Sequence, residues 1–138
     1  MMRWLQRLTG RTPEPEPLRG VRPVRREKTY SSENGYVYQY FYEGYRDIER
    51  GRQRGQDHVF SVTTDRKNRF PVTVFLARQV LEQWERAHER PLSAPEQYAV
   101  VKMTLFQAFD RPNPLGGDDV DVIVSLADME EHASTLDL

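Results

Sequence analysis

The chain has 138 residues, of which 30% are charged and 11% aromatic, and its formal net charge is −1. This length suits a single domain, and the aromatic content is sufficient for a packed core. The absence of cysteine excludes disulfides, thiolate metal sites and a cysteine nucleophile. No apolar run is long enough for a membrane-spanning helix, and arginine and proline stand where a secretory signal is apolar, so we expect a cytoplasmic protein.

The two ends of the chain carry opposite charges. The first 28 residues hold eight basic and three acidic side chains, whereas the last 28 hold one arginine and seven acidic side chains. Four prolines between residues 11 and 26 favour an extended chain. We therefore predict a flexible, basic, proline-rich arm over residues 1–27, a single domain over residues 28–127 and an acidic tail over residues 128–138. Such ends would attract each other, or the ends of a neighbouring copy.

The first ten residues form a short amphipathic segment. Its apolar anchors, Trp4, Leu5 and Leu8, fall close together on a helical projection. A segment of this length is too short to be stably helical alone. Three interpretations of residues 1–10 stay open: disorder, docking on a protein, and contact of the tryptophan with a membrane surface.

Four segments alternate in the way that is typical of β-strands. They are residues 35–45, 58–64, 70–76 and 120–126. Between the first two segments, residues 46–57 contain two glycines and four arginines. This composition predicts a long hairpin loop at that point.

After the third strand segment the apolar period changes from two residues to the 3.6 of a helix. The first helix is expected over residues 77–89, and Pro91 ends it. Ser93 and Glu96 have the spacing of a capping box, which predicts a second helix from there to Phe109. The order β-β-β-α-α-β predicts an α+β domain, with a mostly antiparallel sheet and two helices packed on one face.

The first strand segment carries a tyrosine at every second position. These residues are Tyr36, Tyr38, Tyr40 and Tyr42. Alternate residues of a strand share one face of the sheet, and the predicted strands have apolar residues on both faces. We therefore predict that the face opposite the helices is rich in aromatics. The tyrosines are cross-strand packing partners, or a protein interface such as a homodimer contact, or a platform on which unpaired bases stack.

A cluster of arginines occupies the predicted loop. Its members are Arg46, Arg50, Arg52 and Arg54. Basic loops bind phosphates, which makes contact with nucleic acid one hypothesis for this segment. Four acidic residues nearby dilute the charge, and the predicted domain has no net positive charge. A solvated loop is therefore the simpler interpretation, and nucleic-acid binding stays an alternative.

Neither a catalytic motif nor a metal-binding motif occurs in the sequence. The three histidines, His58, His88 and His132, lack metal-ligand spacing, and no serine lies in a nucleophile-elbow pattern. We expect no cofactor and no metal. The leading hypothesis is a small non-enzymatic protein-interaction module that self-associates through the tyrosine face. The alternatives are a nucleic-acid-associated accessory protein that uses the tyrosines and the arginine loop, and a small enzyme with an unrecognised pocket.

Overall fold

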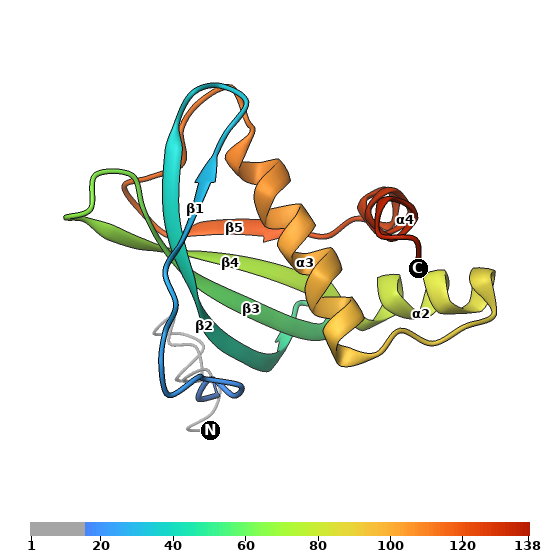
Figure 1. The fold of residues 1–138 in the computed structure, drawn as a ribbon. Coiled ribbons are helices and arrows are strands. Elements are labelled where there is room, and N and C mark those ends of the chain that lie inside the picture. Colours follow the sequence, from blue (N-terminus) through green and yellow to red (C-terminus); the bar gives the residue numbers. More distant parts are fainter. Residues whose placement is uncertain (1–15) are drawn as a thin grey trace.

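The computed structural model describes residues 16–138, so the amphipathic segment predicted for residues 1–10 lies outside the described part. Within that part, five strands form one sheet in the order β1-β2-β3-β4-β5, together with three helices (Figure 1). The strands are β1 (Lys28–Ser31), β2 (Val37–Arg50), β3 (Gln53–Thr63), β4 (Arg69–Ala77) and β5 (Val120–Ile123), and the helices are α2 (Arg78–His88), α3 (Ala94–Phe109) and α4 (Leu126–Thr135). None of these three helices has both the length and the apolar character that crossing a bilayer requires.

The sheet combines an antiparallel meander with one parallel edge. β1 to β4 pair antiparallel in chain order, and β5 pairs with β4 in parallel. A parallel partner needs a crossover connection, and α2 and α3 supply it between β4 and β5. The α+β class predicted from the sequence is confirmed. The structure adds β1 as a further strand and α4 as a third helix among the described residues.

Two of the described helices, α3 and α4, begin with capping boxes that satisfy their first backbone N–H groups, whereas α2 follows β4 without a side-chain cap. In the predicted capping box, the Glu96 backbone N–H donates to the Ser93 hydroxyl at 3.3 Å, and the Ser93 N–H donates to the Glu96 carboxylate at 2.9 Å. α2 ends at Glu89, which has a left-handed conformation with a φ of 50°. α4 begins with a second capping box, formed by Ser125 and Asp128. This second motif was available in the sequence, but the acidic composition around it obscured the helix.

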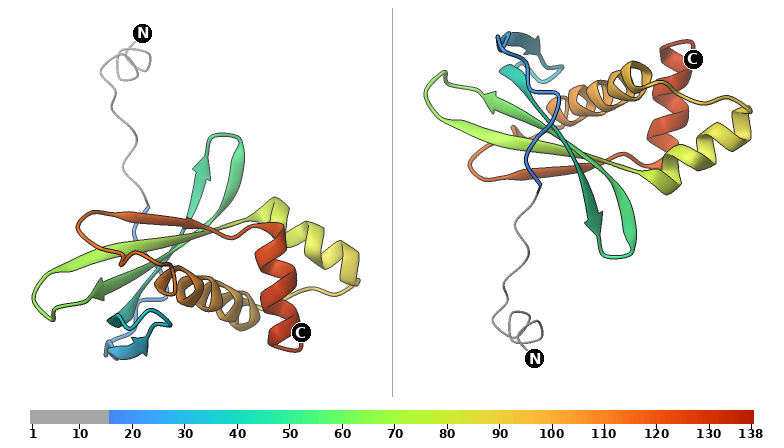
Figure 2. Two further views of the ribbon diagram at one scale, coloured as in Figure 1. Left: turned by 90° about the horizontal axis from the view of Figure 1, so that it is seen from above. Right: turned by 90° about the horizontal axis from the view of Figure 1, so that it is seen from below.

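The core lies between the curved sheet and α3, which crosses one face of it (Figures 1 and 2). Tyr38 stacks on Phe109 of α3, with ring centroids 4.3 Å apart. Tyr30 of β1 stacks in the same way on Phe106, at 4.5 Å. Burying an aromatic or aliphatic side chain of this size contributes about 1.5–3 kcal/mol. The aromatic side chains of β1, β2 and α3 thus hold the helix on the sheet.

The core extends beyond residue 127, where the predicted domain ended. Met129 and Ala133 of α4 are buried, four residues apart on one side of the helix, and α4 contacts both α2 and α3. The buried His132 ring lies 3.0 Å from the Gln107 side-chain oxygen of α3. The segment expected as an acidic tail is therefore a packed helix, because its acidic side chains face solvent while its apolar ones face the core.

The long loop predicted for residues 46–57 is instead the end of a hairpin. β2 and β3 stay paired up to Arg50 and Gln53, so that only Gly51 and Arg52 form the turn. Gly51 has a φ of 59°, a conformation that glycine adopts at low cost. Gly55 lies within the strand, where a Cβ atom would stand 2.3 Å from the Leu76 carbonyl oxygen. Here glycine permits close strand packing, and interpreting it as a loop signal was wrong.

The segment before β1 is attached to the sheet. Arg19 pairs with Tyr45 of β2 through two backbone hydrogen bonds of 2.6 and 2.8 Å. Arg25 forms an ion pair with Glu43, and Glu27 forms one with Arg69 at 2.7 Å. The described part of the predicted arm therefore follows the sheet and places residues 20–22 beside a pocket.

Candidate binding pocket

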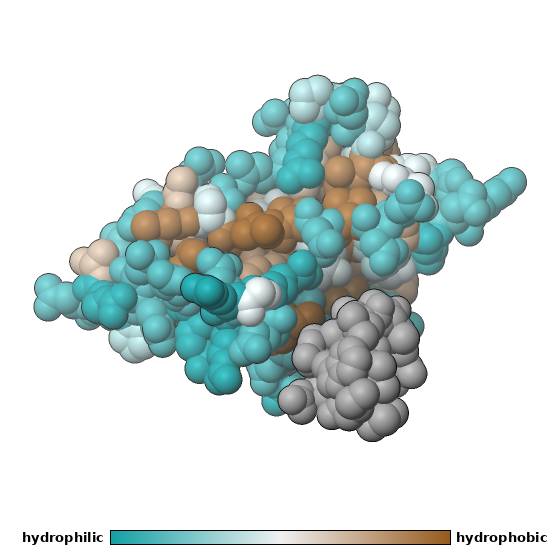
Figure 3. All heavy atoms as spheres, turned by 180° about the vertical axis from the view of Figure 1, so that it is seen from behind, coloured by the Kyte–Doolittle hydropathy of each residue, from teal (hydrophilic) through white to brown (hydrophobic). Residues whose placement is uncertain are grey.

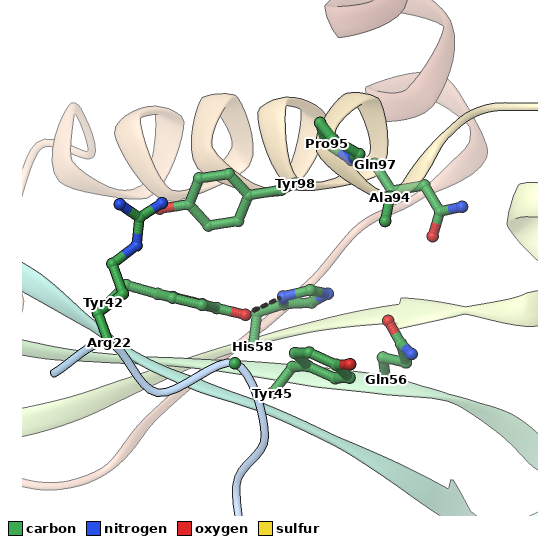
Figure 4. A pocket seen from close by; sticks show the side chains of 10 residues that line it. Arg22, Tyr42, Tyr45, Gln56, His58, Ala94, Pro95, Gln97 and Tyr98 are labelled. Carbon is green, nitrogen blue, oxygen red and sulfur yellow. Dashed lines mark hydrogen bonds between the residues drawn. The ribbon is translucent and has the colours of Figure 1, made fainter.

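A pocket of about 510 Å³ lies between the sheet and the first turn of α3. Its wall comes from β2, β3, α3 and the segment before β1 (Figure 4). The lining residues are Gly20, Arg22, Tyr42, Tyr45, Gln56, His58, Ala94, Pro95, Gln97 and Tyr98. Ser93 is the N-cap of α3, immediately before the helical residues that line the pocket. The capping box thereby fixes the position of Ala94, Pro95 and Tyr98.

Four aromatic rings dominate the lining. The Tyr42 and Tyr98 ring centroids are 4.9 Å apart with an interplanar angle of 68°, and the His58 ring lies 6.5 Å from Tyr98 and 5.9 Å from Tyr45. Figure 4 shows the imidazole of His58 between Tyr98 on the helix and Tyr45 on the strand. The register explains this arrangement, because Tyr45 pairs directly with His58, and Tyr42 pairs with Phe60 just before a bulge that lies between Tyr42 and Gly44.

His58 is neutral at pH 7. It is 5% exposed, and burial lowers the pKa of its imidazole to about 4. Its Nδ1 atom lies 2.9 Å from the Tyr42 hydroxyl, while its buried Nε2 atom has no hydrogen-bond partner among residues 16–138. Burial also raises the pKa of Tyr42 far above its usual range. The pocket floor is therefore polar but uncharged.

Positive charge gathers at the edge of the pocket beside Tyr98. Arg22 is the one charged side chain in the lining, and Figure 4 shows its guanidinium beside the Tyr98 hydroxyl. Lys102 follows Tyr98 by one turn of α3, and Lys28 lies next to it. Burial, together with Lys28 and Arg22, lowers the pKa of Lys102 to about 8. None of these three cations has an acidic partner within ion-pair distance in residues 16–138.

The structure separates the four predicted tyrosines into three environments. Tyr38 and Tyr40 are 0% and 4% exposed and pack beneath α3, so that a partner cannot reach their rings. Tyr36 lies outside β2 in the turn that precedes it. Tyr42 lines the pocket. The tyrosines of β2 therefore lie on the face of the sheet that α3 covers. The prediction that they form an exposed aromatic face on the opposite side was wrong. The alternation of residues does not reveal which face of a sheet the helices cover.

The four predicted arginines do not form a common basic surface. Arg50 donates to Asp57 at 3.0 Å and to Asp121 at 3.1 Å, and its guanidinium lies 5.1 Å from the Phe75 ring centroid. Arg54 pairs with Glu49 across the hairpin. Arg46 lies within β2 and Arg52 in the turn. Two of the four arginines therefore hold the hairpin end together by pairing with acidic residues.

His88 lies outside the pocket and has structural partners of its own. His88 stacks on Trp84 at 4.3 Å and lies 2.8 Å from a Glu130 carboxylate oxygen, which links α2 to α4. In residues 16–138 no three histidine or acidic side chains come together as a metal site would require.

The opposite face of the sheet carries an interrupted band of apolar side chains, bordered by polar ones (Figure 3). Two guanidinium groups lie near the ring of Phe41, with Arg69 4.7 Å and Arg25 5.4 Å from its centroid. Val37 and Ile123 are 49% and 61% exposed at separate places on β2 and β5. This face is therefore partly covered by ion-paired arginines.

The tyrosine pattern of the sequence predicts Tyr42 as a site residue. His58 lacks metal-ligand spacing and carries no other signal, and no sequence pattern points to Arg22, Tyr45 or Tyr98 as site residues. They are distant in the chain, and only the hairpin register and the position of α3 bring them together. Comparison of the chain with protein-family models, with curated proteins and with solved structures found no match.

Proposed function

We propose that this protein is a small non-enzymatic binding module and that the aromatic pocket holds its ligand. The observation that carries the proposal is the arrangement of Tyr42, Tyr45, Tyr98 and His58 around a cavity of about 510 Å³. Cavities of this volume hold drug-sized or metabolite-sized molecules, and binding sites typically combine apolar and aromatic walls with few polar groups.

The ionisation of the pocket favours binding over catalysis. General acid–base catalysis is most effective when the pKa of the catalytic group lies near the working pH. Burial lowers the pKa of His58 to about 4 and raises that of Tyr42 far above its usual range, so neither group exchanges a proton readily at pH 7. The pair instead offers a fixed hydrogen-bonding surface.

The test is a titration of the full chain with indole, a neutral aromatic probe, followed by amide chemical shifts. We expect saturable shifts at Tyr42, Tyr45, His58 and Tyr98. Ala94 is exposed at the pocket wall, so Ala94→Trp should block the cavity and abolish the shifts. Ala87→Trp, an exposed position on α2 outside the lining, is the matched control. Diffuse shifts, or equal shifts in both variants, would contradict the proposal.

Self-association is a second candidate function. The opposite charges of the two ends of the chain favour it. Arginines cluster before β1, and acidic residues cluster at residues 118–131. The measurement is the mass in solution by light scattering, at low and at high salt. A dimer that dissociates as salt rises supports pairing between copies. A monomer at every salt concentration disposes of it.

A further inference from the structure

We infer that the pocket selects a planar aromatic molecule bearing an anionic group, with the ring among Tyr42, Tyr45 and Tyr98 and the anion at Arg22. This inference rests on the proposed function, because it specifies the ligand of the same pocket. In this arrangement the aromatic walls bind the ring of the ligand, and the cationic edge binds its anionic group.

The walls match a flat ring. Tyr42 and Tyr98 meet nearly edge-on, at 68°, and Tyr45 and His58 are tilted by 33°, so that both faces and edges of rings line the cavity. Aromatic rings favour offset-stacked and edge-to-face contacts, each contributing about 0.5–1.5 kcal/mol beyond area burial. A planar ligand can make both kinds of contact here, whereas an alkyl chain would gain only burial.

The positive charge at the edge of the pocket favours a negatively charged ligand. Arg22 lines the pocket, and Lys102 lies one helical turn beyond Tyr98, with Lys28 beside it. No acidic side chain lines the cavity, and none forms an ion pair with these cations in the part of the chain that the structure describes. Neighbouring uncompensated cations repel each other, and an anion placed among them relieves that repulsion. A cationic ligand would add to it.

A carboxylate and a phosphate are both anions that can accept paired hydrogen bonds from an arginine. A guanidinium binds either group through two parallel N–H···O bonds. An aromatic carboxylic acid and a nucleoside monophosphate are therefore two sources of the same recognition. The experiment must separate them and must also separate the effect of charge from that of the ring.

The experiment uses matched probes, with affinities measured by calorimetry on the full chain. One pair is 2-naphthoate and its uncharged carboxamide, and the other is AMP and adenosine. We expect the anion of at least one pair to bind about tenfold more tightly than its neutral twin. Arg22→Gln should remove that preference and leave the affinity for the neutral twin within about twofold. Arg111→Gln, an exposed arginine at the other end of α3, is the control and should change neither affinity.

Each outcome has a distinct meaning. A preference for 2-naphthoate alone identifies a carboxylate ligand, and a preference for AMP alone identifies a phosphate ligand. Equal binding of anion and neutral twin overturns the inference but leaves the proposed pocket function intact. If indole and all four probes fail to bind, both the inference and the proposed function fail.

Discussion

At the scale of single residues, Tyr38 shows how a pattern can be found in the sequence and still be assigned to the wrong side. Its ring stacks on Phe109, and its hydroxyl accepts a hydrogen bond of 2.9 Å from the Leu115 backbone N–H. The period of two predicts that the tyrosines share a face, and they do so in β2. Which face α3 covers depends on the path of the chain between β4 and β5, which no local pattern encodes.

The burial of Tyr38 and Tyr40 predicts that Tyr38→Ala combined with Tyr40→Ala abolishes folding. Each truncation of a large buried aromatic costs about 3–5 kcal/mol, and small domains have a free energy of unfolding of only about 5–15 kcal/mol. Tyr38→Phe retains the stack and leaves the Leu115 N–H unpartnered, at a cost of about 1–3 kcal/mol. Tyr36→Ala, at an exposed position, is the control. A folded double variant in circular dichroism and chemical denaturation would show that these rings are not core.

His58 predicts a loss of stability in acid. The pKa of its imidazole is about 4 in the folded state, against the ordinary value of 6.5 for a histidine in water. Between those values the unfolded chain binds a proton that the folded chain excludes, so the free energy of unfolding falls as pH falls. The expected loss from this residue is about 2 kcal/mol at pH 5.

The test compares the free energy of unfolding of the wild type with that of His58→Gln, measured by urea denaturation between pH 7 and pH 4.5. The variant should lose less stability than the wild type across this range, whatever its stability at pH 7. Parallel curves for the wild type and His58→Gln would show that the folded chain protonates this ring as readily as the unfolded chain does.

At the scale of elements, the sequence predicts what local chemistry determines. The capping box at Ser93 predicts α3 well because its two hydrogen bonds lie within four residues. The extent of the β2–β3 hairpin is not predicted in this way, because Gly55 and the arginines around it are typical of loops. The hairpin is extended instead by contacts distant in sequence. Gly55 pairs with Ala77 of β4, and Arg50 of β2 forms ion pairs with Asp57 and Asp121.

This contrast predicts different costs for alanine at two glycines of the hairpin. Gly55→Ala would place a Cβ atom 2.3 Å from the Leu76 carbonyl oxygen and 2.8 Å from the Ala77 Cα, which β3 and β4 can relieve only by moving apart. Gly51→Ala meets no neighbouring atom and carries only the cost of a positive φ, about 1 kcal/mol. Thermal unfolding should therefore rank Gly55→Ala as clearly more damaging, and equal melting temperatures would contradict the close packing.

At the scale of the whole molecule, the pocket and the C-terminal helix both depend on contacts distant in sequence. The pocket combines residues 20–22, two strands and the start of α3, so no window of the sequence contains it. α4 similarly completes a core whose other members lie in the sheet, in α2 and in α3. Composition described the last residues correctly as acidic but could not show that Met129 and Ala133 find apolar partners.

The packing of α4 predicts that the chain needs its last helix. Met129 is fully buried, so Met129→Ala should lower the free energy of unfolding by about 2–5 kcal/mol, the usual cost of a buried large-to-small change. Glu131→Ala, on the exposed side of the same helix, should change it by no more than about 0.5 kcal/mol. Urea denaturation of the full-length variants measures both. If the two substitutions had equal and small effects, α4 would be a dispensable appendage, as the acidic composition suggested. A large effect of Met129→Ala alone would show that residues beyond 127 belong to the same cooperative unit as the sheet.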